Sequence, residues 1–442
     1  MAWLRDRFLW GLAKLIVAGM FDDLEIDGKT RPDSDRPTLV VSNHLNGLVD
    51  VIAVIVAIGH YPRFVARASL FRRRPLRWVM RAVGAIPIYR AQRDGEVANG
   101  MPHDNQSSFR EIHKALAKGR TVAVFPEGRV SDDERLQPIR TGAARMVLGA
   151  VGAGVESIEI VPIGITYVDK ATTRSRVLVR FGEVIDLSTV LAQVTEGRPP
   201  SEDDRPAVHS LTDLLRERLA LLAPSFGSLA REARLFKVAD LVLRSDLEKP
   251  FSEPLIADTM ELAERIARLP LTTQDQIFDA VGRYHLELSA TGLRDDQIAP
   301  TARLRDLVRT LTRSTLRLVI ALPLAIVGLA TNILPILLVI AVGTAIREPV
   351  TKGTARMVTA LVTFPAAWAF ALWSSGRTGW QLALWVGILV AGSVLLIIAV
   401  ASMIDFVDAG ISWRQVSNRR ALVQKVLQLR YETVAYVTDV LG

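Results

Sequence analysis

The sequence predicts an α/β domain followed by a helical region and a C-terminal membrane region. Strand-like and helix-like runs alternate between residues 24 and 183, which is typical of α/β folds. Residues 201–306 are rich in charge, and their apolar side chains recur with a helical period. Three long uncharged runs then fall within one stretch of 87 residues, and their lengths match the hydrocarbon thickness of a bilayer.

Composition narrows the class of protein. A chain of 442 residues is too long for one average domain, and charged residues make up 23%, too many for a simple bundle of membrane spans. The chain has no cysteine, which excludes disulfides, cysteine zinc sites, iron–sulfur ligation and a thiol nucleophile. The formal net charge of +8 suits anionic partners such as lipid headgroups, phosphorylated substrates or nucleic acid.

Residues 1–23 are expected to form an N-terminal helix at a membrane interface. Trp3, Phe8 and Leu12 fall on an approximate helical stripe with basic residues between them. A helix packed on the protein's own membrane region is the alternative.

We place the α/β domain at residues 24–190 and a helical region of unknown role at 191–310. Residues 37–42 form a strand-like run, and residues 63–67 and 85–89 are interpreted as short strands. The runs that we interpret as buried strands are residues 121–125, 158–167 and 176–181. Residues 48–58 and 107–118 are expected to be helices.

The membrane region is placed at residues 311–410. Its uncharged runs are residues 318–346, 357–373 and 380–404. Pro323 and Pro335 interrupt the first run, which favours a re-entrant hairpin followed by two spans, with three full spans as the alternative. The hairpin places every basic flank on one side, including a basic C-terminal helix at 411–442. We therefore expect an integral membrane protein whose α/β domain is cytoplasmic.

His44 is the histidine in the most informative setting. It directly follows the strand-like run 37–42 and precedes an apolar helix, with Asn46-Gly47 as a turn signal between them. That turn allows Asp50 to meet His44. A His–Asp pair is the arrangement that a general base needs, although a helix-start Asp beside a loop histidine is the structural alternative.

A second motif, Phe125-Pro-Glu-Gly-Arg129, closes a hydrophobic strand. Such a loop can present backbone N–H groups and a guanidinium to an anion, whereas a plain surface turn is the alternative. Histidine spacing predicts no metal site.

Arginine is concentrated ahead of this motif. Between Val51 and Arg93 there are nine arginines and no acidic residue, with Phe71 and Trp78 among them. The run is typical of a surface that meets anionic headgroups or a phosphorylated substrate. Arg90 directly follows the strand-like run 85–89 and so lies at a strand end. Nucleic acid is not an expected partner, because the basic residues lie beside membrane-type sequence.

Together these segments resemble the glycerolipid acyltransferase superfamily, which contains glycerol-3-phosphate and 1-acylglycerol-3-phosphate acyltransferases. The four blocks occur in the family's order. They are Asn43-His44 with Asp50, Gly84-Ala-Ile-Pro-Ile-Tyr-Arg90, Phe125-Pro-Glu-Gly-Arg129 and Val161-Pro-Ile-Gly164. Two details depart from the usual pattern: five residues separate His44 from Asp50 instead of four, and Arg129 follows Gly128 without an intervening Thr. Both departures resemble the pattern of a subgroup of this superfamily that also has a C-terminal hydrophobic region.

The resemblance implies a mixed sheet flanked by helices and an O-acyltransferase of phospholipid biosynthesis. An acyl group would pass from acyl-CoA or acyl carrier protein to glycerol-3-phosphate or lysophosphatidate, with no cofactor. His44 would be the base and Asp50 its orienting partner. Arg90 and Arg129 would hold the acceptor phosphate, Glu127 would position the acceptor or the loop, and Gly128 would let the backbone approach the ligand. A non-catalytic lipid-binding or scaffold protein with the same domain is the alternative.

Overall fold

A computed structural model gives the structure of most of the chain. It describes residues 2–28, 31–32, 35–72, 74–89, 105–130, 136–168, 175–224, 226–244, 254–295, 304–346, 348–418 and 420–442. The chain divides into two compact units. The first comprises Met1–Ser225 and Glu348–Thr354, and the second comprises Phe226–Arg347 and Ala355–Gly442.

The first unit contains an eight-stranded sheet in the order β1–β7–β6–β2–β5–β3–β4, with β8 beside β6. The strands are β1 (Phe21–Asp27), β2 (Thr38–Ser42), β3 (Arg63–Arg67), β4 (Ile86–Ile88), β5 (Thr121–Val124), β6 (Glu159–Tyr167), β7 (Ser175–Phe181) and β8 (Ile185–Asp186). Strands β2 to β6 run parallel to one another, whereas β7 is antiparallel to β6. The predicted mixed sheet is therefore confirmed.

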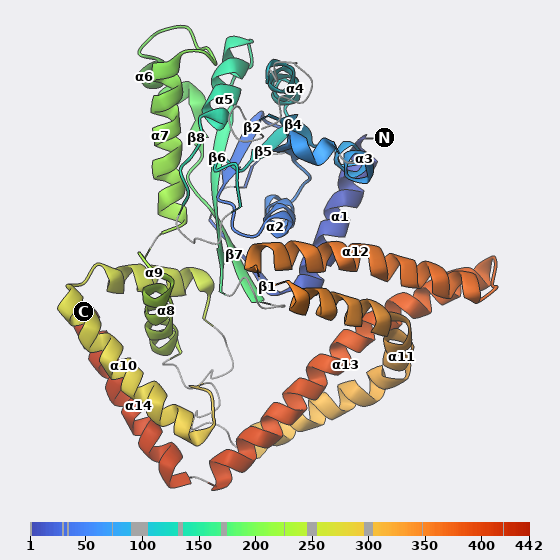
Figure 1. The fold of residues 1–442 in the computed structure, drawn as a ribbon. Coiled ribbons are helices and arrows are strands. Elements are labelled where there is room, and N and C mark those ends of the chain that lie inside the picture. The colour runs from blue at the N-terminus through green and yellow to red at the C-terminus, as the bar shows by residue number, and fades with distance from the viewer. Residues whose placement is uncertain are drawn as a thin grey trace. The chain divides into compact units, whose positions relative to one another are not determined.

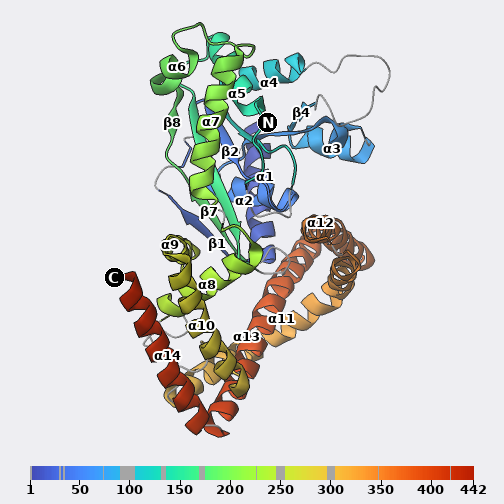
Figure 2. The same ribbon diagram turned by 60° about the vertical axis from the view of Figure 1, so that its left-hand side comes forward.

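Helices cover both faces of this sheet (Figures 1 and 2). The helices of the first unit are α1 (Ala2–Met20), α2 (Leu48–Ile58), α3 (Arg74–Ala82), α4 (Gln106–Leu116), α5 (Gly142–Gly152), α6 (Leu187–Thr195) and α7 (Arg205–Leu222), with a short 3₁₀ helix, η1, at Ala68–Phe71. Leu39 and Val41 of β2 join the core beneath α4, α5 and α7, while Val40 joins the core beneath α1 and α2. Successive side chains of a strand point to opposite faces, so a strand buried on both faces is apolar throughout.

This topology places the carboxyl ends of five parallel strands at one edge of the sheet. In open α/β sheets, ligands bind in the crevice outside those ends. The loops that follow β2 and β5 carry the two motifs identified in the sequence. The core therefore fixes where those loops start.

The six strand runs expected from the sequence all form strands within a few residues of the expected bounds. Strands β1 and β8 were not expected: β1 is an edge strand with alternating charged residues, and β8 has only two residues. The first unit also extends past residue 190, because Leu211 and Leu215 of α7 are buried in the core of the sheet. Two helices of the predicted helical region thus belong to this unit.

Helix α1 occupies the N-terminal segment for which a helix was expected. Ala13 and Val17 are buried against the core that contains α2. Trp3, Phe8 and Leu15 are instead 64–70% exposed. One face of α1 is thus packed on the α/β unit, and its contact with a membrane interface stays a prediction.

The second unit contains a helical core made by α8 (Leu229–Leu243), α9 (Ile256–Ala267), α10 (Leu271–Thr291) and α14 (Arg420–Leu441). A buried charge ties α14 to this core. The Arg430 guanidinium, 1% exposed, donates to both carboxylate oxygens of Asp295 at 2.8 and 3.0 Å and to the Arg244 carbonyl at 2.8 Å. The Tyr284 hydroxyl also donates to Asp295. The C-terminal helix is therefore anchored by a hydrogen-bonded ion pair as well as by apolar packing.

Three further helices of this chain, α11 (Leu304–Ala345), α12 (Pro349–Ser374) and α13 (Trp380–Asn418), are long and apolar enough to cross a membrane. Helix α11 continues through Pro323 and Pro335, instead of forming two helices joined by a turn, and its ribbon bends along its length (Figure 1). The described residues thus contain three helices of this kind, which is the number that the three-span alternative requires. Their orientation in a bilayer stays a prediction.

A buried amide joins these three helices. The Asn332 side chain, on α11 and 1% exposed, donates to Ser393 Oγ of α13 at 2.8 Å and accepts from Trp368 Nε1 of α12 at 2.9 Å. Gly328 and Gly392 let α11 and α13 approach so closely that a Cβ on Gly328 would lie 2.2 Å from the Gly392 carbonyl oxygen. Small residues at the contact and interhelical hydrogen bonds are typical of helices packed in membranes.

Replacing Arg430 tests the anchor of α14. Arg430→Ala leaves Asp295 buried without its cation, and we expect the second unit to lose about 3–5 kcal/mol of unfolding free energy. Lys425→Ala, on the same helix, removes an exposed pair with Glu287 at 3.3 Å and should cost less than about 1 kcal/mol. Native-state proteolysis of the C-terminal helix in detergent measures both. Equal protection of the two variants would contradict the anchor.

Candidate active site

The loop after β2 brings His44 and Asp50 together. Nδ1 of His44 lies 2.9 Å from Oδ2 of Asp50, which sits in the first turn of α2. The Asn46 backbone N–H donates to the same oxygen at 2.7 Å. Gly47 has a φ of 58°, a left-handed conformation that glycine adopts without steric cost. The turn predicted at Asn46-Gly47 is therefore what closes the His–Asp pair.

Both oxygens of the Asp50 carboxylate are hydrogen-bonded, and the residue is fully buried. The Tyr167 hydroxyl, at the carboxyl end of β6, donates to Oδ1 at 2.5 Å. Burial, followed by the nearby Asp50 charge, raises the pKa of Tyr167 well above its ordinary value of 10, so the hydroxyl stays a donor. An ionised Asp50 can only accept, which places the His44 proton on Nδ1 and leaves a lone pair on Nε2.

The His44 ring is held in one orientation. It stacks on Phe125, with centroids 4.0 Å apart and planes 12° apart. Its backbone N–H donates to Glu127 Oε1 at 3.2 Å. The side chain is 15% exposed, and Nε2 makes no hydrogen bond with any residue that the structure describes. A neutral imidazole with a fixed plane and an unoccupied Nε2 is suited to accept a proton.

The loop after β5 holds Glu127 beside this histidine. Gly128 has a φ of 64°, and its N–H donates to the Phe125 carbonyl at 3.0 Å, closing a tight turn. Glu127 is 2% exposed, and its Oε2 has no hydrogen-bond partner among the described residues. Burial raises the pKa of Glu127 to about 7; the His44 N–H lowers it in part and the Asp50 charge raises it. Glu127 is therefore protonated for much of the time near neutral pH.

Two guanidinium groups lie at the same loop. Arg129 donates to the Gln137 side-chain oxygen. Arg67, at the end of β3, donates to the Gly128 carbonyl at 3.3 Å. Neither arginine forms an ion pair with a carboxylate in the described part of the chain. Arg90, the other predicted phosphate ligand, lies outside the described residues.

The structure thus unites His44, Asp50, Glu127, Gly128 and Arg129, and it adds residues for which no role was predicted. Asn43, 1% exposed, exchanges two hydrogen bonds with the Ile165 backbone, at 2.9 and 2.7 Å, and so continues the pairing of β2 with β6 beyond Ser42. Tyr167 and Arg67 end strands that the sequence indicated. Their positions at the carboxyl ends of parallel strands were a usable signal, whereas the partner of Asn43 was not visible in the sequence.

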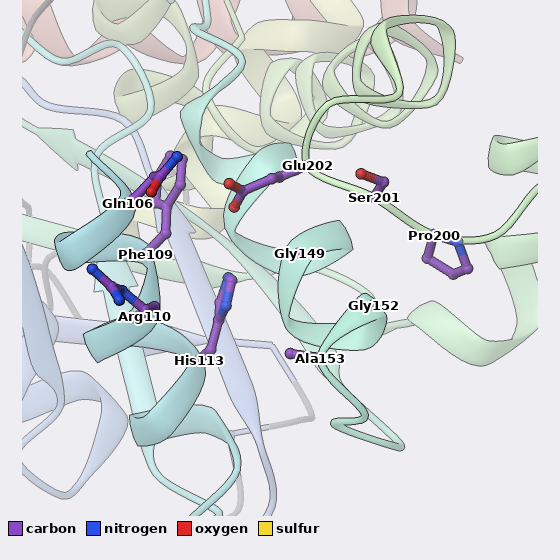
Figure 3. Close-up of a pocket in the computed structure, with 10 residues that line it drawn as sticks. All are labelled: Gln106, Phe109, Arg110, His113, Gly149, Gly152, Ala153, Pro200, Ser201 and Glu202. Carbon is purple, nitrogen blue, oxygen red and sulfur yellow. The ribbon is translucent and has the colours of Figure 1, made fainter. Parts of the chain in front are cut away.

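A second histidine lines an open hollow of about 380 Å³ between α4, α5 and residues 200–202 (Figure 3). His113 points into it, and Gly149 leaves the space that the imidazole and the Glu202 side chain occupy. Burial lowers the pKa of His113. No carboxylate is hydrogen-bonded to His113 within the described ranges, so this ring lacks the orienting partner that His44 has.

Comparison with known proteins matches residues 23–166 to the family described as Acyltransferase. A chloroplastic 1-acyl-sn-glycerol-3-phosphate acyltransferase of Brassica napus is 29% identical over 164 residues, covering 36% of this chain and 44% of that protein. A glycerol-3-phosphate O-acyltransferase of Saccharomyces cerevisiae is 32% identical over 117 residues, covering 26% of this chain and 15% of that protein. The chain thus spans less than half the length of either relative.

The crystal structure of a 1-acyl-sn-glycerophosphate acyltransferase from Thermotoga maritima aligns with 49% of this chain and 80% of its own, at 19% identity and a TM-score of 0.33. The matched family region begins within β1 and ends within β6, so it contains the loops of His44 and Glu127. Residues 23–166 of this chain are thus similar to the acyltransferase family.

Proposed function

We propose that this chain transfers a fatty acyl group from an acyl thioester to a hydroxyl of glycerol-3-phosphate or lysophosphatidate in phospholipid biosynthesis. The observation that carries the proposal is the buried, hydrogen-bonded Asp50 that orients His44 beside the Glu127–Arg129 loop. The names of the two relatives supply the acceptor classes. Acyl-CoA or acyl carrier protein would be the donor, and the reaction needs no further cofactor.

In this mechanism His44 Nε2 removes the acceptor hydroxyl proton while that oxygen attacks the thioester carbonyl carbon. Asp50 holds the imidazole tautomer and stabilises the imidazolium that forms. The tetrahedral intermediate then expels the thiolate sulfur, which takes the proton back from His44. Every proton is thereby returned, and no covalent acyl-enzyme is formed. That route agrees with a chain that contains no cysteine.

The acceptor phosphate would be held by guanidinium groups. Arg129 and Arg67 supply such groups at the Glu127–Arg129 loop, and a guanidinium can form two parallel hydrogen bonds with a phosphate. We extend the same role to Arg90 from the order of the sequence blocks. Glu127 would fix the loop through the His44 backbone and, when protonated, avoid a buried charge beside Asp50. The α/β unit would lie on the cytoplasmic side, where soluble acyl donors are available.

His44→Ala is the main test of the mechanism. Loss of a general base should lower kcat by about 10²–10⁴-fold, because water cannot replace an oriented imidazole. The assay follows thiol release from acyl-CoA by detergent-solubilised protein, with each acceptor in turn. His113→Ala is the matched control and should retain the wild-type rate. If His44→Ala is fully active while folded, His44 is not the base.

Arg129→Ala should mainly weaken acceptor binding. A charge-assisted hydrogen bond contributes about 1.5–3 kcal/mol, so we expect the acceptor KM to rise roughly 10- to 100-fold, with a smaller change in the KM for the donor. Arg110→Ala, on the exposed side of α4, is the control for removal of one positive charge. An unchanged acceptor KM in Arg129→Ala would remove this residue from the phosphate site.

Glu127→Gln tests the protonation of the buried carboxyl. The folded pKa of about 7 exceeds the ordinary 4.5, so between these values the folded state holds a proton that the unfolded state has released. The unfolding free energy therefore falls as pH rises through this window, by about 3 kcal/mol at 1.36 kcal/mol per pKa unit. The variant should lose this slope, leaving it more stable than wild type above pH 7. If the stability of the two proteins against thermal unfolding changes with pH in the same way, the raised pKa of Glu127 is contradicted.

A further inference from the structure

A basic hollow of about 590 Å³ lies beside β4, at the edge of the sheet. Its walls come from η1, α3, β4 and the start of β3. Four arginines line it, Arg63, Arg72, Arg77 and Arg81, against one carboxylate, Glu111. None of the residues proposed for catalysis lines this hollow, so the acyl-transfer site does not account for its charge.

Two arginines of this hollow direct hydrogen bonds to neutral groups. Arg77 uses its donors on neutral groups, the carbonyls of Phe71 at 2.6 Å and Arg72 at 3.1 Å. Arg63 donates to the Gly84 carbonyl at 2.9 Å. Arg63, Arg77 and Arg81 form no ion pair with any carboxylate that the structure describes. Among the described lining residues, positive charge thus exceeds negative charge, and an anion would offset that difference.

One hydrogen-bond donor in the hollow is buried and unpaired. Nε of Arg63 has no partner among the described residues. Leaving a buried donor unsatisfied is unfavourable, and such groups in native proteins call for a ligand, an ion or a water. A phosphate oxygen is the acceptor that guanidinium groups bind most readily in pairs.

The elements that line the basic hollow also carry exposed apolar side chains. Trp78 of α3 is 74% exposed, Val79 of α3 is 42% exposed and Leu70 of η1 is 37% exposed. Indole rings and guanidinium groups together favour the boundary between headgroups and acyl chains of a bilayer. A soluble phosphate compound would give no reason to expose a tryptophan and two aliphatic side chains on the elements that line its site.

We propose that η1 (Ala68–Phe71) and α3 (Arg74–Ala82) form a docking surface for anionic phospholipid, with a lipid phosphate in the arginine-lined hollow and Trp78 at the level of the headgroups. This surface would seat the α/β unit on an anionic membrane independently of the apolar helices. Its existence does not depend on the proposed acyl transfer. Its lipid preference follows from charge complementarity and from the exposed apolar residues beside the hollow.

A single cysteine provides the test, because the chain has none of its own. Val79→Cys, in the full chain, is labelled with a fluorophore and reconstituted into vesicles of phosphatidylcholine alone or with phosphatidylglycerol, each carrying a lipid-borne quencher. We expect quenching that increases with the phosphatidylglycerol fraction. Leu221→Cys on α7, also an exposed apolar position of the first unit, is the matched control and should show no such increase.

Two further measurements separate the possible outcomes. Combining Arg72→Gln and Arg81→Gln should abolish the response to phosphatidylglycerol. High salt should abolish the same response reversibly in the chain with unaltered arginines. The salt experiment does not depend on how a variant folds. Equal quenching in both vesicle types would overturn the proposal. So would a label that responds to inorganic phosphate in phosphatidylcholine vesicles but not to phosphatidylglycerol, because the hollow would then bind a soluble phosphate.

Discussion

The buried carboxylate of Asp50 is the group on which the site depends. A charge in a fully buried position is strongly unfavourable unless every acceptor is satisfied. Here His44, the Asn46 backbone and Tyr167 satisfy it from a loop, a turn and the end of a strand. Those three donors belong to parts of the chain that meet only when β2 and β6 are paired and α2 is in place. The carboxylate therefore links the pairing of the sheet to the orientation of the imidazole.

The neighbouring carboxyl group of Glu127 differs from Asp50 in its hydrogen bonds. Asp50 has a hydrogen bond for each oxygen, whereas one oxygen of Glu127 is buried without a described partner. Two ionised carboxylates beside one histidine would repel each other and would also favour the imidazolium, which cannot act as a base. Keeping Glu127 largely neutral avoids both effects. The site thus contains two buried acidic side chains that differ in their hydrogen bonds, and burial raises the pKa of Glu127 to about 7.

The sequence predicted most of the fold because the core strands are apolar on both faces. The β2 run from Thr38 to Ser42 is buried throughout and the long β6 run is largely buried. Their apolar sequences therefore indicate strands whichever strands lie beside them. Strand β1 was missed since its charged residues suit an exposed edge. In the site, His44, Asp50 and the Glu127 loop were predictable from local turns. The strand-end positions of Tyr167 and Arg67 were also visible in the sequence, but their partners were not, because those depend on which strands are adjacent, and strand order is a property of the whole sheet.

The pairing of Asn43 with the Ile165 backbone has a consequence for how this site can diverge. Asn43 fixes one end of the His44 loop to β6, while α2 and Tyr167 fix the other end at Asp50. With both ends held by hydrogen bonds, His44 and Asp50 meet across a loop that turns at Gly47. A substitution that removes either anchor would therefore be expected to loosen the His–Asp pair, even in a chain that keeps both functional residues.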